Sequence, residues 1–427
     1  MGAVIIVLIA ASIVAAAVRA ARKRRRVATG TAALAAAQAQ EAAIPAFRVV
    51  ALGPRGSGKT LLLSSMYHEM RHPAGRGYFL AAPHREMLAL SGWFNQVADF
   101  DQDWPEGTVA GDTREFTFDV RTRAPSGTVY TVMTLGYLEY AGGVLTEPRP
   151  PGEGFQEELL ERIRSADALF GIIDGLHLRQ WIDGVARGRN RLQHSLTTMV
   201  TLMMAEPRPI TFVITKWDLL RDIDADEDGR LRTVRKLLMT NPDFRELVKV
   251  HSAHRVVRLI PVSAVGPDFA EINTEGRVTK LPDGEMHPTN VDAPLSAVVP
   301  DIFEQVEQLL DTERLNALID GVRRQAAGGL GVALAELGSY AARAAGMAAG
   351  ALSLPYSIFV GEAMLELNKS HERTKVARQN LTERLLSDAE REMADFRDAR
   401  RRVMRELRSR VDVLEGRLPS SRLSDEP

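Results

Sequence analysis

Apolar and polar positions follow two patterns along the middle of the chain, one typical of strands and one typical of helices. The short apolar run Phe47–Leu52 predicts a strand that ends at a glycine. Ala168–Ile173 is apolar throughout, as expected for a strand that is covered on both faces. Arg114–Arg121 alternates between apolar and polar residues, and Val129–Leu138 follows it after a turn at Pro125–Gly127. These two runs predict a hairpin.

Helical segments lie between the apolar runs. Two further strands are expected at Ile210–Ile214 and Val256–Val262, and helices at Thr60–Met70, Phe155–Ser165, Leu192–Met204, Leu231–Leu238 and Ile302–Leu310. Because strands alternate with helices, we expect an α/β fold with a mainly parallel sheet and helices on both faces. His72–Gly111 and Gly266–Pro294 fit this alternation poorly. We expect both to be insertions or long loops on the ligand side.

The first residues differ from the rest of the chain. Gly2–Val18 is uncharged and mostly aliphatic, and as a helix at ~1.5 Å per residue it reaches roughly 25 Å, enough for a hydrocarbon core. Basic residues follow from Arg19 to Arg26, the reverse of their order in a secretory signal peptide. The positive-inside rule then predicts a single transmembrane anchor at 2–19 in the inner (cytoplasmic) membrane, with later residues in the cytoplasm. A buried or cleaved alanine-rich helix is the alternative.

Changes in composition indicate where the domains begin and end. Residues 20–44 are basic and then alanine-rich, without a clear apolar face, and we interpret them as a tether. The basic residues can also contact anionic lipid head groups. The α/β domain is expected at 45–312, and a helical or coiled-coil region at 313–427.

The C-terminal region has two parts. Ala326–Gly350 is rich in small residues, which allow either a packed helix or a hairpin that dips into the membrane; Glu336 and Arg343 favour the packed helix. Glu362–Leu418 is charged and nearly free of glycine and proline. Its apolar residues recur at three- and four-residue steps: Phe396, Val403, Leu407, Val411, Leu414 and Leu418. This stripe predicts either a coiled-coil arm for self-association or for an effector, or a long helix folded back on the α/β domain.

Composition excludes several kinds of chemistry. The 427 residues include no cysteine, so disulfides, thiolate metal sites and cysteine nucleophiles are excluded. The formal net charge is −1, which gives no support for binding to nucleic acid. No nucleic acid is therefore expected among the partners.

A phosphate-binding motif follows the first expected strand. The chain reads, in order, Gly53, Pro54, Arg55, Gly56, Ser57, Gly58, Lys59 and Thr60, which matches G-x-x-x-x-G-K-[ST] in full. Glycines let successive N–H groups face phosphate oxygens, and the helix N-terminus adds its positive dipole end. Lys59 would reach the β- and γ-phosphates, and the Thr60 hydroxyl would ligate Mg²⁺. The motif therefore predicts a nucleoside triphosphate site.

A second motif follows the strand at Ile210–Ile214. Thr215, Lys216 and Asp218 resemble the [NT]-K-x-D element of GTPases of the translation-factor-related class. In that class the carboxylate accepts hydrogen bonds from guanine, so adenine would leave the charge of Asp218 unpaired. Ser263 and Ala264 follow the next strand, where the class carries a Ser-Ala element that touches the base.

The γ-phosphate side of the expected site departs from this class. Glu139 and Gly142 have the spacing of its D-x-x-G element, with glutamate in place of aspartate as a ligand that holds Mg²⁺ through water. Ras-like members carry a glutamine where this chain has Gly143, so we expect slow intrinsic hydrolysis. Thr108 is the favoured switch threonine and metal ligand, and Thr113 is the alternative.

Together these motifs resemble the double-GTPase family of bacterial membrane and conflict-related systems. The resemblance covers about Ala46–Leu310 and implies a P-loop GTPase-like sheet, GTP, GDP and Mg²⁺ as ligands, and a regulatory role. It makes Lys59, Thr60, Thr108, Glu139 and Gly142 the catalytic residues. A non-hydrolysing nucleotide-binding scaffold is the second hypothesis. A P-loop ATPase is the third and weaker hypothesis. A Walker B strand would end in Asp-Glu, and Ile172–Asp174 matches that pattern only in part.

Overall fold

The computed structural model describes residues 46–73, 75–107, 113–125, 127–140, 153–307 and 375–423. Two compact units divide the chain, one of Met1–Pro45 with Leu310–Arg397 and one of Ala46–Leu309 with Asp398–Pro427. In the first unit the structure describes only the helical residues Lys375–Arg397. The fold and the candidate site below belong to the second unit.

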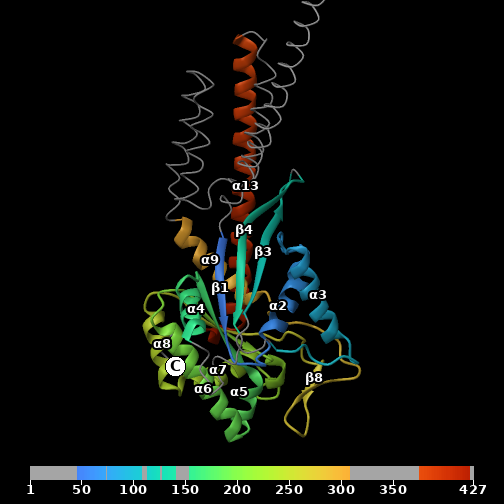
Figure 1. Ribbon diagram of the computed structural model, residues 1–427, viewed down its shortest axis with the longest axis vertical. Helices are drawn as coiled ribbons and strands as arrows, with labels where there is room; N and C mark the ends of the chain where they lie inside the picture. The colour runs from blue at the N-terminus through green and yellow to red at the C-terminus, as the bar shows by residue number, and fades with distance from the viewer. Residues whose placement is uncertain are drawn as a thin grey trace, which may run out of the picture. The chain divides into compact units, whose positions relative to one another are not determined.

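A mainly parallel sheet forms the centre of this unit (Figure 1). It has eight strands in the order β10-β7-β6-β5-β1-β4-β3-β2. The parallel strands are β4 (Val129–Tyr140), β1 (Ala46–Leu52), β5 (Ala168–Asp174), β6 (Ile210–Thr215) and β7 (Val257–Pro261). The antiparallel strands are β3 (Thr113–Arg123) and β2 (Phe79–Ala81) at one edge, and β10 (Arg422–Leu423) at the other. The α/β class and the mainly parallel sheet predicted from the sequence are confirmed.

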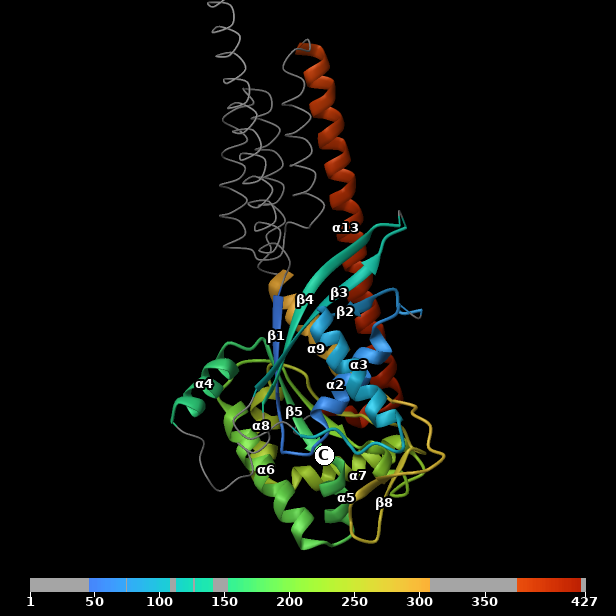
Figure 2. The same cartoon turned by 45° about the vertical axis from the view of Figure 1, so that its right-hand side comes forward.

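Helices cover the sheet because its central strands are apolar on both faces. Every residue of β5 and of β6 is buried, which requires cover on each side. Figure 2 shows α4, α6 and α8 on one side of the sheet, and α2 and α3 on the other. The helices are α2 (Lys59–Met70), α3 (His84–Ala98), α4 (Glu153–Arg164), α5 (Gly175–Ile182), α6 (Ala186–Met204), α7 (Glu227–Met239), α8 (Pro242–Ser252), α9 (Ala293–Glu307) and α13 (Lys375–Arg417), with short helices η2 (Trp217–Leu220) and η3 (Pro419–Ser421).

The two stretches expected to be insertions or long loops contain regular structure. The stretch His72–Gly111 holds β2 and the four-turn helix α3, whose apolar residues Leu90, Phe94 and Val97 are buried. The stretch Gly266–Pro294 holds a small separate hairpin of β8 (Ala270–Ile272) and β9 (Val278–Lys280).

These two insertions pack against each other. Val97 of α3 shares a buried cluster with Val265, Phe269 and Ala270, and Trp104 packs against that cluster. This cluster lies outside the central sheet and joins the segment after α3 to the segment after β7.

The C-terminal part of α13 packs on the sheet unit. The stripe residues Val403, Leu407, Val411, Leu414 and Leu418 are all buried. Asp398–Pro427 belongs to the same compact unit as Ala46–Leu309. The apolar stripe of the helix and the pairing of β10 with β7 join this segment to the sheet.

The order of the strands reverses at β1. From β1 the chain moves to β4 on one side, and from β4 it returns to β5 on the other side. In open α/β sheets, ligands bind at such a reversal, beyond the carboxyl ends of the parallel strands. Among the helices that the structure describes, none is long and apolar enough to cross a membrane, and the proposed anchor at 2–19 lies outside them.

Candidate functional site

The phosphate-loop motif connects the carboxyl end of β1 to α2, at the reversal of strand order. Gly56 and Gly58 have φ angles of +77° and +82°, in the left-handed region that glycine adopts without a steric penalty. Gly53 has no space for a side chain, because a Cβ atom there would lie 2.7 Å from Ile172 Cβ and 2.9 Å from the Ile172 carbonyl oxygen. The glycines of the motif are therefore required by its local geometry.

Lys59 places its ammonium group inside this loop. Its Nζ donates to the carbonyl oxygens of Gly53 at 2.8 Å and Pro54 at 3.0 Å. An ammonium has three donors, so one remains for a phosphate oxygen. Burial lowers the pKa of Lys59 to about 8, although the negative charges of Glu139 and Asp174 oppose the shift. A bound phosphate would stabilise the charged form.

Thr60 and Glu139 meet at the edge of the loop. Glu139 is buried near the end of β4 and is in register with Ala51 of β1. The Thr60 hydroxyl lies 2.8 Å and 3.0 Å from the two carboxylate oxygens. Hydroxyl and carboxylate oxygens suit Mg²⁺, which uses few protein ligands when phosphates and water complete its shell. The pair fits that ion, although the described part of the chain has no group of three or more acidic or histidine side chains placed so that they could hold a metal ion.

The loop after β6 is hydrogen-bonded to the phosphate loop. The Thr215 hydroxyl donates to the Ser57 carbonyl oxygen at 2.6 Å and lies 3.2 Å from the Ile173 carbonyl oxygen. Lys216 donates from Nζ to the Gly56 carbonyl oxygen at 2.7 Å. Lys216 itself has a φ of 53°, which turns the chain sharply at the end of the strand. The phosphate loop and the loop after β6 therefore form one connected unit.

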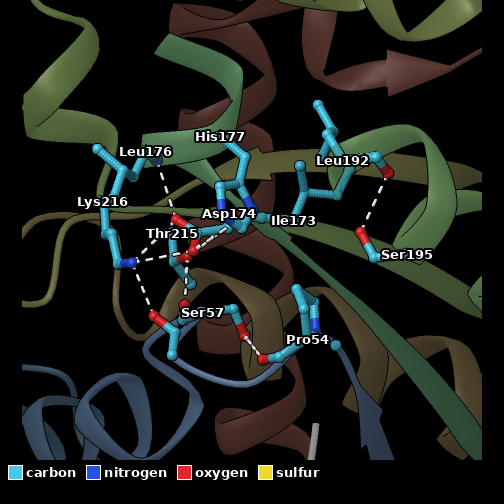
Figure 3. A network of polar contacts seen from close by, with 12 residues as sticks. Pro54, Ser57, Ile173, Asp174, Leu176, His177, Leu192, Ser195, Thr215 and Lys216 are labelled. Carbon is cyan, nitrogen blue, oxygen red and sulfur yellow. Dashed lines mark hydrogen bonds and ion pairs between the residues drawn. The ribbon is translucent and has the colours of Figure 1, made fainter. Parts of the chain in front are cut away.

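Asp174 is a member of this site that the sequence analysis did not assign to it. Figure 3 shows Lys216 bound to Asp174, with a distance of 2.9 Å from Nζ to Oδ1. Asp174 also caps α5, since it accepts a hydrogen bond from Leu176 N at 2.9 Å. Burial lowers the pKa of the adjacent His177, although Asp174 opposes the shift. The sequence does contain a sign of this role, because Asp174 directly follows the apolar run Ala168–Ile173, at the carboxyl end of a buried strand.

Asp218 and Ser263 come together on the far side of the Thr215 loop. The Ser263 hydroxyl donates to Asp218 Oδ1 at 2.5 Å and accepts from Gly266 N at 2.8 Å. Burial raises the pKa of Asp218, and the hydrogen bond from Ser263 opposes the shift. The carbonyl oxygen of Ala264 accepts a hydrogen bond from the Ser65 hydroxyl at 2.8 Å, which ties this loop to α2.

Two residues considered for the site are exposed, and three lie in segments that the structure does not describe. Arg55 is exposed on the loop, and Thr113 is the exposed first residue of β3. Thr108, Gly142 and Gly143 lie outside the described residues.

The geometry places three sequence motifs at the carboxyl ends of β1, β6 and β7, and Glu139 near the carboxyl end of β4, within an α/β unit. No protein-family model matches the chain. No curated protein matches it either.

Proposed function

We propose that this chain is a GTP-binding protein that acts as a membrane-anchored GTPase switch with slow intrinsic hydrolysis. It would bind GTP and GDP with Mg²⁺, have the P-loop GTPase-like form of an α/β sheet, and serve a regulatory role. Residues 2–19 would hold it on the cytoplasmic face of the inner membrane. Its C-terminal helices would contact a second copy or a protein effector.

One observation carries the proposal. The base-reading motif, far along the chain from the phosphate loop, donates to that loop through Thr215 and Lys216. The loop cradles phosphates, and Asp218 lies on the next turn of chain, where a purine joined to those phosphates would extend. Adenine would offer this buried carboxylate no donor beyond the Ser263 hydroxyl that it already has, whereas guanine offers two.

Each polar group then has a defined task in binding. Lys59 and the N–H groups of the loop would hold the β- and γ-phosphates, as in other P-loop proteins. Thr60 and Glu139 would hold Mg²⁺, directly or through water, and the ion would neutralise charge on the phosphate oxygens.

A nucleotide panel on the full chain in mild detergent tests the guanine assignment. We expect the wild type to bind GTP and GDP and to reject ATP. Asp218→Asn should weaken GTP binding by at least about 100-fold and favour xanthosine triphosphate, because an amide donates where the carboxylate accepts. Asp222→Asn, a change at an exposed aspartate nearby, is the matched control. A chain that binds ATP and ignores GTP would overturn the assignment in favour of an ATPase.

Phosphate release separates a switch from a scaffold. Gly143 provides no side chain to position water, which favours the non-hydrolysing scaffold as the second candidate. We expect slow turnover by the wild type and none by Lys59→Ala. Equal rates for the two proteins would support the scaffold.

Fractionation of cells tests the anchor. The full chain should sediment with membranes and resist extraction by salt, and a variant that lacks residues 2–19 should be released. A full chain that remains soluble would contradict the proposed location.

A further inference from the structure

Arg114 is a cation beside the phosphate loop to which the proposed function gives no role. It is the second residue of β3, and its Cα is in register with Glu139 of β4. Its Nη1 lies 3.5 Å from Thr60 Oγ1. Thr60 and Glu139 are the pair proposed for the metal, so the guanidinium lies at the γ-phosphate end of the site.

The ring of Trp93 holds this guanidinium. Arg114 Cζ lies 4.9 Å from the Trp93 ring centroid, a cation–π contact that limits the motion of a long side chain. The same ring packs edge-on against Phe116, with centroids 6.0 Å apart and planes at 75°. Phe116 is two residues after Arg114 and shares its face of the strand.

Helix α3, which carries Trp93, is fixed on both sides (Figure 2). The Ser64 hydroxyl of α2 donates to the Leu90 carbonyl oxygen at 2.7 Å. Thr117 N of β3 donates to Glu86 Oε2 at 2.6 Å. Helix α3, which belongs to the inserted stretch, thus positions Arg114 beside the phosphate loop through Trp93.

Two other cations of the site, Lys59 and Lys216, already have partners within the protein. Lys59 donates to two carbonyl oxygens of the loop, and Lys216 is paired with Asp174. Arginine is also the better group for a phosphoryl oxygen array, because its planar fork presents several donors at once.

We infer that Arg114 is a further catalytic residue, a built-in arginine that stabilises the charge on the γ-phosphoryl group during GTP hydrolysis. The inference rests on the proposed function. The oxygen of water bonds to the γ-phosphorus while the bond from that phosphorus to the β–γ bridging oxygen breaks. The bonding electron pair stays on GDP, one water proton remains on the released phosphate, and the other passes to solvent. Arg114 gains and loses no proton; it donates hydrogen bonds to oxygens whose charge shifts in the transition state.

This role matches what the chain lacks elsewhere. Gly143 replaces the glutamine that orients water in Ras-like proteins. An arginine supplied within the same chain raises hydrolysis in GTPases even where a partner is absent. A site that has Arg114 to stabilise the phosphoryl group, but no glutamine to orient water, should hydrolyse GTP slowly and without a partner protein.

Single-turnover phosphate release by the full chain in mild detergent tests the inference. Arg114→Ala should lower the rate on the order of 100-fold, while the affinity for GTP changes by less than about threefold. Arg114→Lys should recover only part of the rate, because a point charge replaces the fork. Trp93→Leu should lower the rate in the same direction. Added guanidinium ion at millimolar concentration should partly restore Arg114→Ala, a rescue that a merely structural role would not give.

Matched controls come from β3 and from the segment that follows α3. Arg121→Ala changes an arginine of β3 that pairs with Asp119, and Trp104→Leu changes a tryptophan that packs on Phe269 instead. Both variants should keep the wild-type rate.

The outcomes separate this inference from the proposed function. If the wild type binds no GTP, both fail. If it binds GTP but turns over no faster than Lys59→Ala, hydrolysis and the role of Arg114 fail while binding stands. If turnover is present and Arg114→Ala keeps the wild-type rate, or loses GTP affinity as much as rate, Arg114 is not catalytic and the switch remains.

Discussion

Single buried residues determine what this site can recognise. Asp218 is 9% exposed and has one hydroxyl partner, Ser263. Burial disfavours its charged form, and the donors of a guanine ring would favour it. Recognition of the base and ionisation of one carboxyl are therefore linked.

This linkage predicts that GTP affinity depends on pH. Burial raises the pKa of Asp218 in the free protein, and bound guanine should lower it, because guanine donates to the carboxylate. Affinity should therefore be full above the free-state pKa and fall as the pH drops through it, by up to about tenfold per unit. Calorimetric titration across the acid range measures this fall. Asp218→Asn, which cannot ionise, should lose this acid dependence; an unchanged profile would contradict the linkage.

Gly175 gives a second prediction at the scale of one residue. A Cβ atom at this position would lie 2.2 Å from the Thr215 carbonyl oxygen and 2.8 Å from the Lys216 carbonyl oxygen. Since both atoms are backbone, Gly175→Ala must displace the base-reading loop and should weaken GTP binding at least tenfold. Gly92→Ala is the control, because a Cβ there meets nothing within 4 Å. Equal GTP affinities of the two variants would show that the loop adapts.

Elements differ in how well the sequence predicts them. The buried strands β5 and β6 were found because a strand covered on both faces must be apolar throughout. α8 was missed because Pro242 interrupts the apolar pattern. In the structure this proline occupies the first turn of the helix, where its missing N–H is harmless, and Asn241 caps that turn. α3 was missed because its apolar residues are buried by two separate elements: Phe94 stacks on His68 of α2, and Val97 packs in a cluster with Val265.

The candidate site was predicted unevenly for a similar reason. Glycine and lysine spacing in the phosphate loop follows from local backbone geometry, so the motif could be read directly. Arg114 and Asp174 could not, because their roles depend on which strands become neighbours.

Lys280 joins the two inserted elements. Its Nζ donates to the carbonyl oxygens of Gln96, Asp99 and Gln102, at 3.0, 2.6 and 2.6 Å. These bonds hold the segment after α3. Lys280→Met keeps the length of the side chain and removes the donors, so amide hydrogens of residues 99–107 should exchange about tenfold faster.

Hydrogen exchange with mass spectrometry checks this prediction. Lys249→Met, at an exposed position of α8, should leave the same segment unchanged. Unaltered exchange in Lys280→Met would show that the apolar contacts and the other hydrogen bonds of the segment, from Gln96 to Asp103 and from Trp104 to Val278, are sufficient to hold it.

At the scale of the whole unit, the C-terminal helix is joined to the sheet by one buried arginine and two partly buried carboxylates. Arg258 of β7 lies 2.7 Å from Asp301 of α9 and 2.9 Å from Glu415 of α13. Burial would lower the pKa of Arg258, but the two carboxylates outweigh it and raise the pKa. Arg258 therefore stays charged and needs both partners.

Removing one partner should destabilise the unit. Glu415→Gln should lower the free energy of unfolding by about 1–2 kcal/mol, because Arg258 loses one of its two carboxylate partners and keeps Asp301. The double change Arg258→Met with Glu415→Leu should recover much of that loss. Urea unfolding measures both, with Asp398→Asn in an exposed ion pair as the control. A Glu415→Gln protein as stable as the wild type would mean that Asp301 alone suffices.

The pairing of β10 with β7 has a consequence for biosynthesis. A ribosome translates β7 well before Arg422–Leu423, with the whole of 308–374 in between. Until the later strand emerges, the nascent sheet presents an open row of N–H and C=O groups to other chains. Chains truncated before β10 should therefore aggregate through the exposed edge of β7. In the full chain, β10 pairs with this edge.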